Sequence, residues 1–116
     1  MLSFSKSLIA ASSKPLILGI LQEGTSYGYR IIQSVKEISS GQLEWSDGML
    51  YPVLHRLEKE GLIQSQWMQS EEGRHRKYYA ITEAGKAALH QEKEHWTRMN
   101  EVMQNLWLLN PSTSNS

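Results

Sequence analysis

The chain has 116 residues, including 12 Lys or Arg and 12 Asp or Glu, so its formal net charge is zero at pH 7. This length predicts one domain with a modest core, and the zero charge argues against binding nucleic acid by bulk electrostatics. The lack of cysteine excludes disulfides and thiolate metal sites. Without a long apolar run or a signal peptide, the sequence favours a cytoplasmic protein with no membrane segment.

Two helices are expected at the start of the chain. A short first helix is indicated over 3–11, and a second is expected to be capped by Ser12 or Ser13 with Pro15 in its first turn. The segment 16–21, LILGIL, is apolar on every side. It therefore predicts a helix that is buried all round.

The segment 25–41 predicts the first helix of a helix-turn-helix. Thr25 or Ser26 is expected to cap this helix, and Gly41 is expected to end it. Its inner stripe is expected to comprise Ile31, Ile32, Val35 and Ile38. Residues 43–45 are then expected to form a very short strand that pairs with a later ribbon.

A well-capped helix is predicted after Trp45. Ser46 can accept a hydrogen bond from a first-turn amide, Asp47 suits the positive helix end, and Gly61 suits a left-handed residue after the last turn. Trp45 and Leu50 have the spacing of a hydrophobic staple. The apolar stripe comprises Leu50, Val53, Leu54 and Leu57.

The opposite side of this helix is the candidate DNA-reading face. It carries Gly48, Tyr51, Pro52, His55, Arg56 and Lys59, and the capping Ser46 is also assigned to the DNA contact. Its aromatic, cationic and imidazole groups can contact base edges or phosphates, although an ordinary solvated surface would look similar. Tyr51 could instead pack under the ribbon as core, and Pro52 is expected to bend the helix axis.

A β-hairpin with a basic tip is predicted next. Segments 62–69 and 77–81 contain strand-forming residues, and SEEGRHR between them has a turn glycine. The tip is expected to hold Arg74, His75, Arg76 and Lys77. Basic hairpin tips are common, so the tip alone is weak evidence for DNA binding. Its position just after a capped helix makes the evidence stronger. That order is typical of a winged helix-turn-helix, whose helix enters the major groove while the ribbon follows the backbone.

A long last helix is predicted to begin at Thr82, with Glu83 in its first turn. Apolar residues recur along it at the spacing of a coiled-coil seam: Leu89, Trp96, Met99, Met103 and Leu106. We expect the same seam of a second copy to cover it in a two-fold contact, to which Leu8 is also assigned. The predicted fold is thus mainly α with a small β-hairpin. It comprises a winged helix-turn-helix domain over 1–81, a C-terminal dimerisation helix over 82–109 and a disordered tail over 110–116.

Four stretches carry a resemblance to a known family: SYGYRIIQSV, SDGMLYPVLHRLEKEGLI, GRHRKYY and AITEAGKAAL. Over about Leu16 to Leu89 the chain resembles the PadR-like family of bacterial transcriptional regulators. The resemblance implies a homodimeric repressor that binds a palindromic operator in double-stranded DNA through Tyr51, His55 and the ribbon cations. Many members respond to phenolic acids or planar cationic drugs, and Trp96 falls where small members place a ligand-stacking tryptophan. Met99 and Met103 would line such a site.

The same residues are also compatible with other functions. Trp96 and its methionines could be dimer core rather than a site for a small aromatic ligand. No catalytic Ser/His/Asp or Cys/His set is evident, and His90 and His95 lack the spacing of a helical metal pair, so no enzyme, cofactor or metal is expected. The rival function is a winged-helix protein-interaction module that does not bind DNA, which the zero net charge and the acidic last helix favour slightly.

Overall fold

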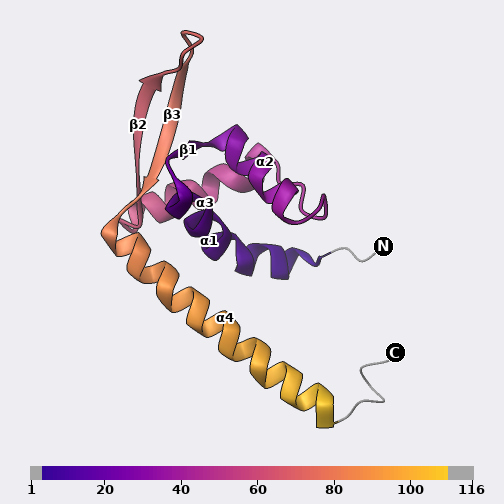
Figure 1. The fold of residues 1–116 in the computed structure, drawn as a ribbon. Helices are drawn as coiled ribbons and strands as arrows, with labels where there is room; N and C mark the ends of the chain where they lie inside the picture. Colours follow the sequence, from indigo (N-terminus) through magenta and orange to yellow (C-terminus); the bar gives the residue numbers. More distant parts are fainter. Residues whose placement is uncertain (1–3, 110–116) are drawn as a thin grey trace.

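The computed structural model describes residues 4–109, and within them four helices and three short strands follow one another along the chain (Figure 1). The tail predicted over 110–116 lies outside the described residues. The elements are α1 (Lys6–Glu23), β1 (Ser26–Tyr27), α2 (Gly28–Ile38), α3 (Asp47–Lys59), β2 (Ile63–Gln69), β3 (His75–Ile81) and α4 (Glu83–Leu109). The hairpin of β2 and β3, called the wing below, projects from one side of the helices, and α4 projects from the other (Figure 1). The predicted fold class is confirmed.

The two helices expected at the start form one continuous helix, α1, so that prediction was wrong. Ser5 is its N-cap and accepts a hydrogen bond from Leu8 N at 3.1 Å. The hydroxyls of Ser12 and Ser13 instead donate to carbonyls three residues earlier, at 3.2 and 2.8 Å, as serines inside a helix do. Pro15 therefore lies inside α1 rather than in a first turn.

The core lies where α1, α2, α3 and the base of the wing meet. Its fully or nearly buried apolar side chains include Ile17, Leu18, Leu21, Ile31, Val35, Leu50, Leu54, Leu57, Ile63 and Tyr79. The predicted inner stripe of α2 is confirmed at Ile31 and Val35, and Ile32 is half-buried. Ile38 was wrongly included, because it is the last residue of α2 and its side chain is 66% exposed.

The short third strand was predicted at the wrong place. Residues Ser26 and Tyr27 pair with Tyr79 and Tyr78, giving an antiparallel sheet in the order β1-β3-β2. Because these residues are extended, neither Thr25 nor Ser26 caps α2, which begins at Gly28 without a side-chain cap. The segment 43–45 is not a strand, and Trp45 is buried in the core instead.

The predicted ends of α3 are confirmed. Ser46 caps the helix by accepting from Met49 N at 3.2 Å. At the other end Gly61 has φ +79°, its amide donates to the Glu58 carbonyl, and Leu62 N donates to the Leu57 carbonyl, both at 3.0 Å. This is a Schellman motif, which stops the helix and turns the chain into β2.

The junction between the wing and α4 is tightly built. Thr82 caps α4 as predicted, because its Oγ1 accepts from Gly85 N at 3.1 Å and donates to the Gly61 carbonyl at 2.7 Å. A Cβ on Gly85 would lie 2.7 Å from Ile81 Cγ1 and closer still to the Leu62 carbonyl oxygen. The first turns of α4 are thereby fixed against the end of the Schellman turn. Among residues 4–109, no helix has both the length and the apolar character needed to span a membrane.

Candidate nucleic-acid interface

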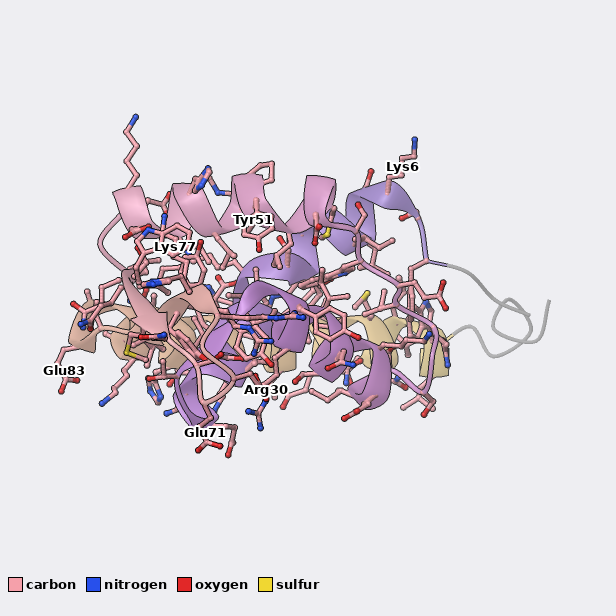
Figure 2. All side chains as sticks on the ribbon, turned by 90° about the horizontal axis from the view of Figure 1, so that it is seen from above. Lys6, Arg30, Tyr51, Glu71, Lys77 and Glu83 are labelled. Carbon is pink, nitrogen blue, oxygen red and sulfur yellow. The ribbon has the colours of Figure 1, made fainter. Side chains whose placement is uncertain are left out.

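A groove runs between α3 and the wing, and we call it the wing groove. Side chains from β1, α2, α3, β2, β3 and the wing turn line it: Tyr27, Tyr29, Tyr51, His55, Trp67, Arg74, His75, Arg76, Lys77 and Tyr79. Six of these were predicted to contact DNA, from two segments separated by about twenty residues of sequence. In the view from above, Tyr51 and Lys77 lie on the side of α3, whereas Arg30 and Glu71 lie toward the opposite side (Figure 2).

The two faces of the wing carry different cations. Tyr79 is buried against the helices, so Lys77 and His75, two and four residues earlier in the same strand, share its face. Arg76 lies on the other face, where its guanidinium stacks over the Tyr27 ring at 4.4 Å. The expected basic tip is thus mainly a basic strand, because β3 begins at His75 and leaves only Arg74 in the turn.

The turn of the wing is held by its own backbone. Ser70 N donates to the Arg74 carbonyl at 2.7 Å, and Gly73 N donates to the Ser70 carbonyl at 2.9 Å. Gly73 has φ +83°, a conformation that glycine adopts at little cost. Arg74 is therefore presented from an ordered turn.

Tyr51 is fixed where α2 and α3 meet. It is 37% exposed, and its ring lies against Gly28, the first residue of α2. Its neighbour Tyr79 is 1% exposed, and the Tyr79 hydroxyl has no hydrogen-bond partner among the described residues. Burial, then the nearby Tyr51 and Glu58, raise the pKa of Tyr79. Tyr51 thus packs partly under the wing, while its remaining surface faces the groove.

The other predicted residues of α3 lie outside the wing groove. At 3.6 residues per turn, Gly48, Pro52 and Lys59 are opposite the buried stripe, on the outermost face of the helix. α3 is continuous through Pro52. Ser46 acts as the N-cap, and Arg56 lies on the far flank of α3, in a second cleft described below.

Sequence reasoning missed four aromatic residues of the groove, Tyr27, Tyr29, Trp67 and Tyr79, and two of them are exposed. Trp67 on β2 is 65% exposed and stands opposite Lys77 in the strand register. Tyr29, in the first turn of α2, is 64% exposed and accepts a hydrogen bond from Gln33 Nε2 at 3.1 Å. Because side chains alternate along a strand, the sequence could have predicted that Trp67 and Ser65 lie on the same face of β2. It could not have predicted that this face of the wing turns toward α3.

The predicted ligand and dimer residues lie along α1 and α4. An apolar groove, which we call the Trp96 groove, is lined by Phe4, Leu8, Ile9, Ser12, Pro15, Leu16, Leu43 and Trp96. Leu8 and Trp96, assigned to one seam from sequence, are thus brought together. Leu89 is only 2% exposed and belongs to the subunit's own core, so its assignment to the dimer seam is corrected.

Comparisons with known proteins agree with this architecture. Residues 17–91 match the family described as the transcriptional regulator PadR-like family. A transcriptional regulator from Clostridium thermocellum is 32% identical, with a TM-score of 0.79 over 86% of this chain and 97% of that one. A PadR-like transcriptional regulator from Bacillus cereus is 30% identical, with a TM-score of 0.76 over 87% of this chain and 96% of that one.

Sequence relatives give the same picture. An uncharacterized protein of Lysinibacillus sphaericus is 33% identical over 88 residues, which is 76% of this chain and 81% of that protein. The transcriptional regulator YqjI of Escherichia coli is 34% identical over 79 residues, or 68% of this chain, and the match spans 36% of YqjI. By its family match and its winged-helix fold with a long C-terminal helix, the chain belongs to the PadR-like family of transcriptional regulators.

Proposed function

We propose that this protein is a dimeric, sequence-specific DNA-binding repressor whose wing groove receives one strand of the duplex. The observation that carries the proposal is the convergence of Tyr51 and His55 from α3 with Arg74, His75 and Lys77 from the wing. Donors from a helix and from a ribbon then face one concave surface, as the docking of a winged helix on DNA requires.

In this proposal α3 enters the major groove along its outermost face. Lys59 and the outer edge of His55 would meet base edges or phosphates, while Gly48 and Pro52 present no long side chain and allow close approach. Arg74, Arg76 and Lys77 would hold the adjacent backbone. Local placement of cations thus compensates for a net charge of zero.

The proposed dimer uses the exposed apolar surface of α4 together with α1. Several large apolar side chains are more than a third exposed there: Phe4, Leu8, Trp96, Met99, Val102, Leu106 and Trp107. Met103 lies on the same helix and is half-buried. So many exposed apolar side chains along one helix and its neighbour favour association. A two-fold contact would place two α3 helices on one face of a palindromic operator, about 34–36 Å or a multiple apart.

The same surface supports a proposed site for a planar aromatic ligand. Trp96 is 37% exposed and borders an apolar groove, and the exposed Met99 lies three residues further along α4. Methionine side chains adapt to differently shaped aromatic partners. A ligand held there would change operator affinity only if it favours one dimer geometry.

The DNA proposal is tested by the salt dependence of binding. Replacing Arg74, Arg76 and Lys77 together with alanine should weaken binding to every sequence and reduce the slope of log K against log salt by about 0.9 per lost phosphate contact. Replacing Lys36, Lys86 and Lys93 removes the same charge from exposed sites away from the groove, and should leave the slope unchanged. Equal slopes for the two triple variants would contradict the placement.

The ligand proposal is tested with a planar aromatic cation such as 9-aminoacridine. Trp96→Ala should raise its Kd at least tenfold, whereas Trp67→Ala, at an exposed tryptophan of the wing, should change it less than twofold. Full binding by Trp96→Ala would assign this residue to the dimer core alone. A protein that dimerises yet binds no DNA upstream of its own gene would favour the protein-interaction alternative.

A further inference from the structure

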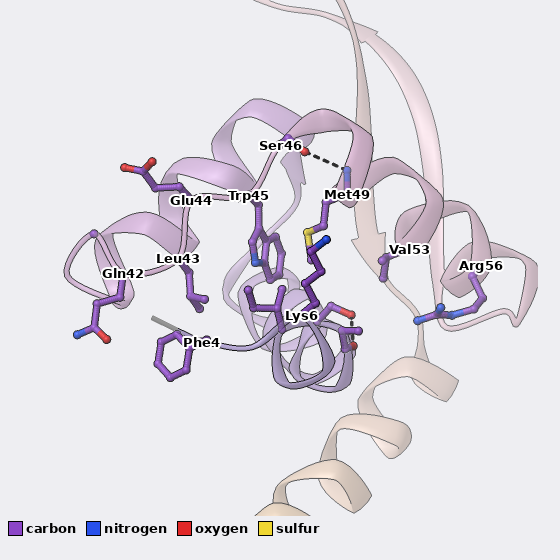
Figure 3. A pocket seen from close by; sticks show the side chains of 14 residues that line it. Phe4, Lys6, Gln42, Leu43, Glu44, Trp45, Ser46, Met49, Val53 and Arg56 are labelled. Carbon is purple, nitrogen blue, oxygen red and sulfur yellow. Dashed lines mark hydrogen bonds between the residues drawn. The ribbon is translucent and has the colours of Figure 1, made fainter. Parts of the chain in front are cut away.

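A second cleft, which we call the Trp45 cleft, lies on the flank of α3 away from the wing groove. It is bounded by the first half of α1, the segment before α3 and α3 itself (Figure 3). Its apolar lining includes Phe4, Ile9, Leu43, Met49 and Val53. The site is therefore concave and largely apolar, as small-molecule sites usually are.

The indole of Trp45 is the feature that points to an occupant. The side chain is 6% exposed, and Nε1 has no hydrogen-bond partner among the described residues. The ring reaches into the cleft between Leu43 and Met49 (Figure 3). A buried N–H without a partner is destabilising, and buried indoles usually have one. An acceptor brought into the cleft would satisfy it.

The charges around the cleft favour an anionic acceptor. Lys6 from α1 and Arg56 from α3 both line it, and neither forms an ion pair within residues 4–109. The acidic group of the lining, Glu44, is paired with Lys36 at 3.4 Å. Two cations without an ion-pair partner in the described chain thus line the same cleft as a buried hydrogen-bond donor.

We propose that the Trp45 cleft binds a small apolar molecule that carries a carboxylate or a similar anionic group. The apolar body packs against Ile9, Met49 and Val53, and the anionic group accepts from Trp45 Nε1. Lys6 and Arg56 neutralise its charge. Because Nε1 is shielded from solvent, some lining side chains must move slightly when the molecule binds. Phe4 is one of these lining side chains, and it is 37% exposed.

This cleft is chemically distinct from the Trp96 groove. The two share Phe4, Ile9 and Leu43, but among residues 4–109 no charged side chain lines the Trp96 groove. The Trp45 cleft also takes Met49, Val53 and Arg56 from α3, so its occupant would touch the helix that carries Tyr51 and His55. The binding site itself does not depend on the proposed DNA function.

The test uses the indole N–H signals of the full chain labelled with ¹⁵N, assigned by Trp→Phe variants at each of the four tryptophans. The probe is 1-naphthoate, and 1-naphthylmethylammonium, of the same ring system and opposite charge, is its control. We expect naphthoate to move the Trp45 signal downfield in a saturable way, with the cation causing less than a tenth of that change. A shift of Trp96 with Trp45 unmoved, equal binding of the cation, or no binding at millimolar naphthoate would each overturn the proposal.

Surface variants keep the test independent of folding, because Trp45→Phe alters the core. Lys6→Gln and Arg56→Gln should each raise the Kd for naphthoate by about threefold to tenfold. Lys86→Gln removes the same charge at the start of α4 and should leave the Kd unchanged. Wild-type affinity in both cleft variants would also overturn the proposal.

Discussion

The ring of Tyr51 on α3 lies directly on the backbone of Gly28, the first residue of α2. A Cβ at position 28 would stand 2.9 Å from Tyr51 Cζ and nearer still to the hydroxyl oxygen. Gly28 therefore allows the two helices of the helix-turn-helix to approach, and its backbone fixes the direction in which Tyr51 enters the wing groove.

Gly28→Ala should lower the free energy of unfolding by about 1–3 kcal/mol, since the added methyl group has to displace the Tyr51 ring. Gly19→Ala, in α1, is the matched control. Outside the backbone of its own helix turns, the added Cβ would meet no atom of the described residues within 4 Å, so stability should rise by about 0.5–1 kcal/mol. Urea unfolding measures both. In a Gly28→Ala/Tyr51→Ala double variant, the two losses should be less than additive, because removing the Tyr51 ring also removes its clash with the added methyl group. Strict additivity would contradict the contact.

Ser46→Ala should destabilise the protein by about 1 kcal/mol, since the amide of Met49 loses its acceptor at the start of α3. Ser46→Asp supplies another acceptor and should recover most of the loss. Chemical unfolding of the three proteins checks this. If alanine and aspartate behaved alike, the cap would not be contributing.

The wing groove predicts an unequal effect at two neighbouring residues of β2. Trp67→Ala should weaken DNA binding at least fivefold, because Trp67 lies on the groove side opposite Lys77. Met68→Ala, on the other face of the same strand, should change binding less than twofold. Fluorescence anisotropy with a labelled duplex distinguishes them. Comparable losses would mean that DNA does not enter this groove.

Tyr79 predicts a specific loss of stability in alkali. Burial raises the pKa of Tyr79 in the folded protein above the ordinary value near 10, because the folded state favours the neutral phenol. The stability that comes from this preference is fully present below about pH 10 and is lost as the pH rises through the folded pKa. Tyr79→Phe should abolish that part of the loss. It should cost little at pH 7, since the Tyr79 hydroxyl has no partner among residues 4–109. Tyr29→Phe, at an exposed position, should retain the wild-type alkaline loss, and an unaltered pH profile in Tyr79→Phe would refute the assignment.

Local signals in the sequence were sufficient for the parts of the fold that depend on neighbouring residues. Ser46 and Gly61 were correctly identified as the ends of α3, because capping needs only a hydroxyl and a left-handed glycine at the right spacing. A serine hydroxyl can either cap a new helix or, inside a helix, donate to the carbonyl three residues earlier, as Ser12 and Ser13 do. Which of the two forms depends on the packing of the whole segment. That is why α1 was predicted as two helices.

The errors in the sheet and the site come from long-range pairing. Whether Ser26 and Tyr27 or residues 43–45 join the wing depends on which segment reaches Tyr78 and Tyr79, a contact across some fifty residues. Likewise, Arg56 follows His55 directly, yet the 100° between successive helical residues sends it to the opposite flank, into the Trp45 cleft. The sequence prediction grouped all polar residues of one side of α3 into a single face. It therefore did not separate the wing groove, lined by His55, from the Trp45 cleft, lined by Arg56.

DNA footprinting on the region upstream of the protein's own gene tests most directly whether the protein binds as a two-fold regulator that reads sequence with α3. We expect the purified protein to protect two symmetric half-sites whose centres are about 10–10.5 base pairs or a multiple apart. The triple variant lacking Arg74, Arg76 and Lys77 should lose this protection at the same salt concentration. Protection of a single half-site, or none that survives excess unrelated DNA, would contradict a two-fold regulator that reads sequence with α3.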